Sequence, residues 1–157
     1  MAGLIAATVQ SAIGWVIQRA FLPPGYDNNI APRLVNRALR QLGQPSHPAV
    51  DWIGGVLFHY VYGIGWGALF GLARRAAPLP PPALGTVVAG LIYLLAFSRV
   101  GVGTRTGAEQ HPDRRPAVKQ ASLIAIVLAY VVSLVVAYDR LDRRGRTGGP
   151  PDEEPRA

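Results

Sequence analysis

The sequence contains no cysteine, and this absence excludes two kinds of site at once. Neither a disulfide framework nor a metal centre held by thiolates can form in this chain. Acidic residues are also few, with nine Asp and Glu against sixteen Lys and Arg. No pair of carboxylates falls inside an apolar run, and no serine has the context of a nucleophile elbow. We therefore predict a protein that is not an enzyme, with no catalytic residue, no metal site and no cofactor.

Formal charge is missing from long stretches of the chain, and this determines the fold class. Half of the residues are hydrophobic. Apolar runs of about 20 residues have the length that crosses a bilayer as a helix. We predict an all-α integral membrane protein, a four-helix bundle with one amphipathic interfacial helix in its first loop and a disordered C-terminal tail. The predicted spanning helices are residues 2–22, 52–73, 82–99 and 119–138.

The first loop contains a shorter helical pattern that is charged on one side only. Residues 30–43 place aliphatic side chains on one face and Arg33, Arg37 and Arg40 on the other. The segment is too short and too charged to span, which predicts an amphipathic helix in the membrane interface with its arginines toward lipid headgroups. A cap that packs on the loop side of the bundle is the alternative.

Two further segments are polar. Residues 101–116 are rich in glycine and charge, and we predict a loop there. Residues 147–157, with the sequence TGGPPDEEPRA, have the composition of a disordered tail.

Small residues recur at every fourth position in three of the predicted spanning helices. In lipid, stripes of this kind let helix backbones approach closely. We predict that the stripes of the second and fourth helices are packing surfaces, facing either each other or another subunit. They consist of Gly55, Gly63, Gly67 and Gly71, and of Ala121, Ala125, Ala129 and Ser133. Gly3, Ala7 and Ser11 form a shorter stripe in the first helix.

His59 is the one ionisable side chain well inside a predicted spanning segment. Such residues are costly in lipid and usually face the protein interior. One interpretation is a neutral histidine that joins two helices by a hydrogen bond. The other is a site that carries a proton or binds a ligand, because histidine titrates near neutral pH. A metal site shared with His47 and His111 is not predicted, since no acidic residue is well placed beside them.

All four predicted helices contribute polar side chains to the same half of the membrane. We interpret these side chains as a candidate polar site for an anionic headgroup or a small solute. Ordinary anchoring at the interface by snorkelling side chains is the alternative. The residues are Gln18, Arg19, His59, Ser98, Arg99 and Gln120.

Three stretches give the chain a resemblance to a known family. They are the proline-rich exit FLPPG, the segment LFHYVYGIGWGALFG around His59, and the charged run YDRLDRRGR after the last helix. With these motifs, most of the chain resembles the small bacterial inner-membrane proteins typified by YagU, a family that brings no established reaction. The resemblance implies the bacterial inner membrane, with both termini in the cytoplasm. The positive-inside rule does not decide the orientation, because Lys and Arg divide almost evenly between the two sides.

These features predict a non-enzymatic polytopic membrane protein that self-associates or binds a membrane partner through its small-residue stripes. One alternative is a pathway for a small solute or a proton, lined by His59. Another is an accessory subunit of a larger membrane complex. The predicted partners are the lipid bilayer and a second copy or another membrane protein. Nucleic acid is not predicted, because the positive charge sits at the ends of apolar runs and no basic soluble domain carries it.

Overall fold

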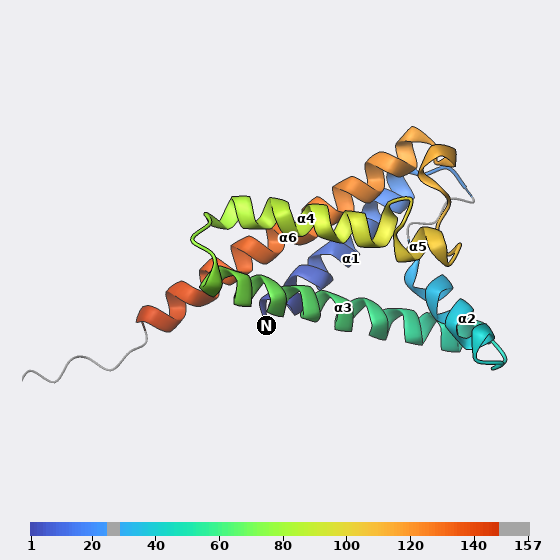
Figure 1. The fold of residues 1–157 in the computed structure, drawn as a ribbon, viewed down its shortest axis with the longest axis horizontal. Helices are drawn as coiled ribbons and strands as arrows, with labels where there is room; N and C mark the ends of the chain where they lie inside the picture. The colour runs from blue at the N-terminus through green and yellow to red at the C-terminus, as the bar shows by residue number, and fades with distance from the viewer. Residues whose placement is uncertain (25–28, 148–157) are drawn as a thin grey trace, which may run out of the picture.

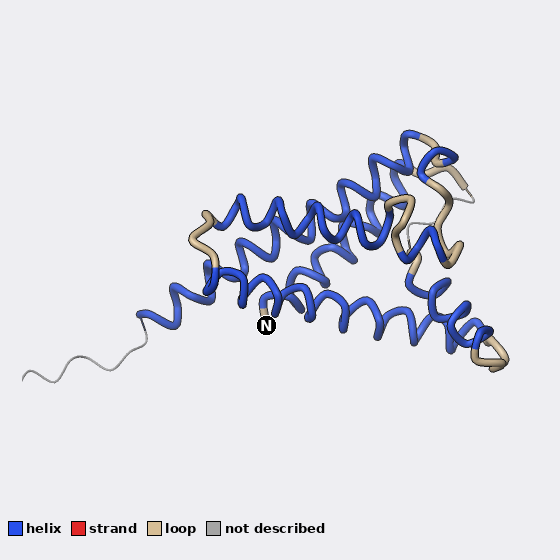
Figure 2. Tube along the Cα trace, viewed as in Figure 1, coloured by secondary structure: helices blue, strands red, loops and turns tan. Residues whose placement is uncertain are grey.

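The computed structural model describes residues 1–24 and 29–147, and in these ranges all regular structure is helical (Figure 2). The prediction of an all-α protein is therefore confirmed for the described residues. Of the predicted tail, only Thr147 belongs to them, as the last residue of the final helix. The rest of the tail lies outside the described residues.

Four long helices form the body of the molecule, and their directions alternate along the chain (Figure 1). They are α1 (Ala2–Phe21), α3 (Pro48–Ala76), α4 (Pro81–Phe97) and α6 (Ala117–Thr147). The N-terminus, the α3–α4 connection and the end of α6 therefore lie toward one end of the bundle, here called the tail end (Figure 1). The other two connections lie at the opposite end, here called the loop end.

Among the described residues, three segments are long and apolar enough to cross a membrane. They are Pro48–Ala76, Pro81–Arg105 and Ala117–Arg144. The helix α1 is not one of them, although its 20 residues reach about 30 Å at 1.5 Å per residue. It contains three polar or charged residues of long side chain, Gln10, Gln18 and Arg19.

The connections at the loop end contain three shorter elements. The first is α2 (Ala31–Gln41), which packs against α3. The second connection, where we predicted a loop throughout, contains α5 (Val102–Arg105) and the 3₁₀ turn η1 (Pro112–Arg114). Glycine permits this compact turn: a Cβ at Gly103 would lie 2.6 Å from the carbonyl oxygen of Ala96.

The long helices extend past the predicted spans where the chain supplies helix-forming signals. At the start of α3, Pro48 suits the first turn, and the Nδ1 atom of His47 accepts the Ala49 N–H at 3.2 Å. The helix therefore begins before residue 52. At the other end of the chain, α6 continues past residue 138 through a segment rich in arginine, which is a good helix former.

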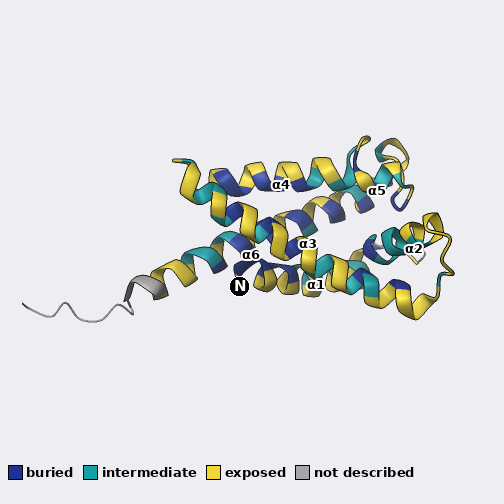
Figure 3. Ribbon diagram, turned by 60° about the horizontal axis from the view of Figure 1, so that its bottom comes forward, coloured by how far each residue is buried: buried dark blue, intermediate teal, exposed yellow. Residues whose placement is uncertain are grey.

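The core lies where α1, α3 and α4 converge on α6. Its fully covered side chains include Ala6, Phe70 and Leu134, one from each of three helices. The outward faces of α3 and α4 are exposed and apolar (Figure 3), with side chains such as Leu57, Val61 and Leu91. Apolar outward faces on these candidate spans are what contact with lipid requires.

Candidate functional site at the loop end of the bundle

The glycine stripe of α3 is occupied over its centre by α1. A Cβ at Gly67 would lie 2.6 Å from the Cα of Gly3, and a Cβ at Gly63 would lie 2.8 Å from the Cβ of Ala7. The two backbones approach so closely that no larger residue fits between them without a shift. Here the small residues of α3 meet the small residues of α1, which is the arrangement that tight helix packing in membranes uses.

The two ends of the same stripe meet other elements. At the loop end, a Cβ at Gly55 would lie 2.6 Å from the backbone nitrogen of Pro32 in α2. At the tail end, a Cβ at Gly71 would lie 3.3 Å from the ring of Tyr138 in α6. The stripe is therefore covered within the chain by α2, α1 and α6 in turn.

The small-residue stripe of α6 is placed differently. Ala121 and Ala125 are exposed, whereas Ala129 and Ser133 are half-buried. The two stripes do not meet, because α1 packs against both α3 and α6. Contact between α3 and α6 comes instead from longer side chains, such as the Tyr130 hydroxyl, which donates to the Gly63 carbonyl at 2.5 Å.

His59 joins α3 to α1. Its Nε2 atom lies 3.1 Å from the hydroxyl of Ser11 and 3.4 Å from the carbonyl oxygen of Ala7. The Ser11 hydroxyl donates to the same carbonyl at 2.9 Å. Neither of the two cavities described below is lined by His59. The geometry is that of a hydrogen-bonded bridge between two helices.

This bridge predicts a small effect for His59→Gln. Glutamine can still hydrogen bond to Ser11, and hydrogen bonds between membrane helices contribute about 0.6 kcal/mol on average. We expect the variant to fold and to differ from the wild type in free energy of unfolding by less than about 1 kcal/mol. In proteoliposomes that report internal pH between pH 5 and 8, both proteins should match protein-free vesicles. A proton flux seen only with the wild type would refute the structural role.

The other residues of the predicted polar site are not brought together into one cluster. Gln18 lies half-buried on α1, and the remaining four residues each have a separate partner. The guanidinium carbon of Arg19 lies 4.4 Å from the centroid of the Trp15 ring. Ser98 bonds to the Leu94 carbonyl, Arg99 to the Asp113 carboxylate, and Gln120 to the Tyr93 hydroxyl.

A buried ion cluster at the loop end was missed by the sequence analysis. The carboxylate of Glu109 is fully covered, and its Oε1 atom lies 2.7 Å from Nζ of Lys119, which is itself 2 % exposed. The Nε atom of Arg115 lies 3.8 Å from the same oxygen, and Nη2 of Arg33 lies 3.8 Å from Oε2. One carboxylate thus holds cations from α2, from the second connection and from α6.

Arg115 also organises the backbone of the second connection. Its Nε donates to the Gln110 carbonyl at 2.7 Å, and its Nη2 donates to the Thr104 hydroxyl at 3.2 Å. The N–H of Glu109 donates to the Gly103 carbonyl at 2.8 Å. Buried charges need such partners, because an unpaired ion away from water costs several kcal/mol. The second connection is therefore a folded unit rather than an open loop.

Two of the arginines predicted to contact lipid headgroups also reach this folded connection. Arg33 pairs with Glu109, and Nη1 of Arg37 donates to the Thr106 carbonyl at 2.5 Å. Arg40 is exposed. The helix α2 thus lies between the start of α3 and the second connection, and contacts both.

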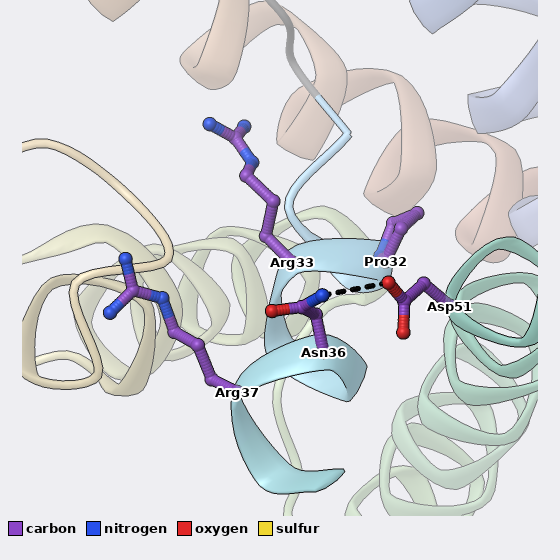
Figure 4. Close-up of a pocket in the computed structure, with 5 residues that line it drawn as sticks. All are labelled: Pro32, Arg33, Asn36, Arg37 and Asp51. Atoms are coloured by element: carbon purple, nitrogen blue, oxygen red, sulfur yellow. Dashed lines mark hydrogen bonds between the residues drawn. The ribbon is translucent and has the colours of Figure 1, made fainter. Parts of the chain in front are cut away.

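A cavity of about 320 Å³ lies beside α2 (Figure 4), lined by Pro32, Arg33, Asn36, Arg37 and Asp51. Asp51 is buried, and its Oδ2 atom accepts hydrogen bonds from Asn36 and Ser46, both at 2.8 Å. Its Oδ1 atom is also buried, but it has no hydrogen-bond partner among the described residues. The cavity therefore has two arginines and Asp51 in its lining, and the Oδ1 atom of Asp51 is buried without a hydrogen-bond partner among the described residues.

A second cavity, of about 270 Å³, lies in the seam between α4 and α6. It is apolar in character and contains one glycine, Gly90, at which a Cβ would have no heavy atom of the described chain within 4 Å. Its lining residues are Thr86, Ala89, Gly90, Tyr93, Ile124, Val127 and Leu128.

No protein-family model, curated protein or solved structure matches this chain. The three histidines lie apart, with His47 at the start of α3 and His111 beside Asp113 at 3.2 Å. In residues 1–24 and 29–147, no three side chains of the types that bind metals are grouped closely enough to share an ion.

Proposed function

We propose that the chain is a non-enzymatic, polytopic protein of the bacterial inner membrane that assembles with a second copy or another membrane protein. The proposed contact is the seam between α4 and α6. One observation carries the proposal: this seam has an apolar hollow at Gly90 and is flanked by the exposed Ala121 and Ala125. Small residues exposed to lipid give a partner helix room for close approach. By contrast, the glycine stripe of α3 is already covered within the chain.

We include α1 as a fourth spanning helix. Its support is packing: α1 contacts α3 and α6, which are both candidate spans, and Gly3 lies against the middle of α3 at Gly67. An antiparallel helix in close contact with a spanning helix lies at the same membrane depth. Gln18 and Arg19 fall in its last turn, where long polar side chains reach the interface.

We place α2 in the membrane interface. It packs on α3 at Gly54 and Gly55, which lie one helical turn after Asp51 near the start of that helix. A helix at this level lies beside lipid headgroups. Arg40, on its exposed side, is then available to lipid phosphates.

We propose that both termini are cytoplasmic, as the resemblance to the YagU family implies. The chain has no cysteine, so single-cysteine variants report topology without background. In intact cells, a membrane-impermeant maleimide should label Gln44→Cys at the loop end and leave Leu79→Cys at the tail end unlabelled. The reverse pattern would contradict the proposed orientation.

The assembly proposal predicts that Gly90→Leu weakens self-association. A Cβ at this position meets no neighbouring side chain within 4 Å, and the hollow leaves space for the rest of a leucine, so the monomer should fold normally. Overpacking of a formed interface typically costs about 1–3 kcal/mol, which is at least roughly a fivefold loss of affinity. Single-molecule photobleaching of labelled protein in liposomes, at several protein-to-lipid ratios, would measure the dimer fraction.

Gly65→Leu is the matched control. Gly65 is also exposed on a candidate span, and a Cβ there has no heavy atom of the described chain within 4 Å. This variant should associate like the wild type. A wild type that stays monomeric at all ratios would refute self-association, and equal dimer fractions for the two variants would exclude the seam at Gly90.

A further inference from the structure

We propose that the cavity beside α2 binds the headgroup of an aminophospholipid, a phosphate ester that carries a primary ammonium group. In this arrangement Asp51 receives the ammonium, and the arginine side of the cavity faces the phosphate. The inference rests on the proposed membrane placement, but it does not depend on the assembly of copies through the α4–α6 seam.

The carboxylate side of the cavity lacks a hydrogen-bond donor. Asp51 is 9 % exposed, and only its Oδ2 atom is bonded, to Asn36 and Ser46. The buried Oδ1 atom has no partner among the described residues. A buried acceptor without a partner costs free energy, which a donor from a ligand would recover once the Asp51 carboxylate turned toward the cavity. A primary ammonium brings three N–H donors and the opposite charge.

The arginine side of the cavity favours an anion. Arg33 and Arg37 are one turn apart on α2, with Asn36 between them (Figure 4). The bond from Arg37 to Thr106 uses one of the five N–H donors of its guanidinium group, and the remaining donors suit phosphate oxygens. Around Glu109 as well, cationic side chains outnumber carboxylates. A ligand with only a positive charge would therefore be disfavoured here.

The position of the cavity points to a lipid as the source of this headgroup. Asp51 is followed directly by Trp52 and Ile53, which are exposed on the outward side of α3. Tryptophan is typical of the membrane–water interface. Acyl chains attached to a headgroup in the cavity can lie along this apolar surface. The volume, about 320 Å³, is at the small end of the roughly 300–1,000 Å³ of small-molecule sites.

The experiment compares short-chain phosphatidylethanolamine with phosphatidylcholine, using the full-length protein in detergent and native mass spectrometry to measure binding. The two headgroups have the same net charge, but the quaternary ammonium of choline has no N–H to donate. We expect the ethanolamine lipid to bind about tenfold more tightly, the difference typical of one hydrogen bond to a charged group. Equal affinities, or tighter binding of phosphatidylglycerol, would overturn the assignment of the ammonium.

Variants separate the two sides of the cavity. Asp51→Asn should remove the preference for ethanolamine over choline, whereas Arg37→Gln should weaken both lipids and keep their ratio. Asp113→Asn, which changes a carboxylate paired with Arg99 outside the cavity, should behave like the wild type. Should Asp51→Asn fail to fold, the wild-type ratio and the Arg37→Gln ratio still decide. A preference that survives in a folded Asp51→Asn protein would refute the role of Asp51.

Two further arms distinguish the source of the ligand and the two proposals. Soluble glycerophosphoethanolamine should bind at least tenfold more weakly than the lipid, because it lacks acyl chains that contact α3. Equal binding of the soluble compound and the lipid would refute a lipid as the source of the headgroup. Gly90→Leu should keep the full preference for ethanolamine, since its position is remote from α2. The Gly90→Leu variant therefore distinguishes a loss of assembly from a loss of headgroup binding.

Discussion

Replacing Gly67 with isoleucine is expected to lower the free energy of unfolding by about 3 kcal/mol, at the upper end of typical overpacking costs. The new Cβ would lie 2.6 Å from the Cα and 2.9 Å from the nitrogen of Gly3. These are backbone atoms, which cannot rotate away as a flexible side chain can. The helices α1 and α3 must therefore separate. The surface at which they touch also contains the hydrogen bonds of His59 to Ser11 and Ala7.

Denaturation with sodium dodecyl sulfate in mixed micelles, followed by tryptophan fluorescence, would measure this loss. Gly65→Ile is the appropriate control, because it adds the same side chain to the same helix at an exposed position. The control should stay within about 0.5 kcal/mol of the wild type, as is usual for surface substitutions. If the two variants were equally stable, α1 and α3 would not be in backbone contact at Gly67.

Glu109→Gln is expected to cost about 3–5 kcal/mol, because removing one partner leaves buried charges uncompensated. Glutamine keeps the size of the side chain but not its charge. Lys119 is 2 % exposed and Arg115 is 8 % exposed, so water cannot replace the carboxylate. The same denaturation assay would show the loss, and protease cleavage within residues 99–116 would show whether the second connection opens.

Two comparisons make the prediction specific. Asp113→Asn removes a carboxylate from an exposed pair with Arg99, and exposed pairs contribute only about 0–1 kcal/mol. Adding Lys119→Met to Glu109→Gln should recover part of the lost stability, because it removes the most closely placed unmatched cation. Equal effects of Glu109→Gln and Asp113→Asn would mean that Glu109 is not buried with its cations.

The helices could be predicted from the sequence because each is encoded by a continuous pattern of residues that are neighbours along the chain. Long apolar runs define α3, α4 and α6, and a proline at or just before the first residue of each marks its start. The partner of the glycine stripe could not be predicted in the same way. Small residues recur every four positions in α1 and in α6 alike, so the spacing fits either helix. The choice between them depends on how all four helices pack together.

The ion cluster shows a second limit of reasoning from the sequence. Arg115 and Lys119 stand just before an apolar run, and Arg33 lies on the charged face of a short amphipathic helix, both places where charged residues normally anchor a helix at the membrane surface. Their common partner, Glu109, lies in a glycine-rich polar segment with no periodic pattern. Only the folded second connection brings the four side chains together. The sequence does contain one signal for such a cluster. Acidic residues are scarce, so a carboxylate that lies near several cationic residues is a candidate partner for those cations.

The packing of α1 also has a consequence for the order in which the protein is made. Among the described helices, α1 is synthesised before all the others and α6 after them, and these two helices contact each other. Until residue 117 has been synthesised, α1 can pack against α3 alone, and Glu109 is without Lys119. Addition of α6 therefore completes the core and the loop end in one step. A nascent chain that stops earlier lacks both, however well its first three long helices have formed.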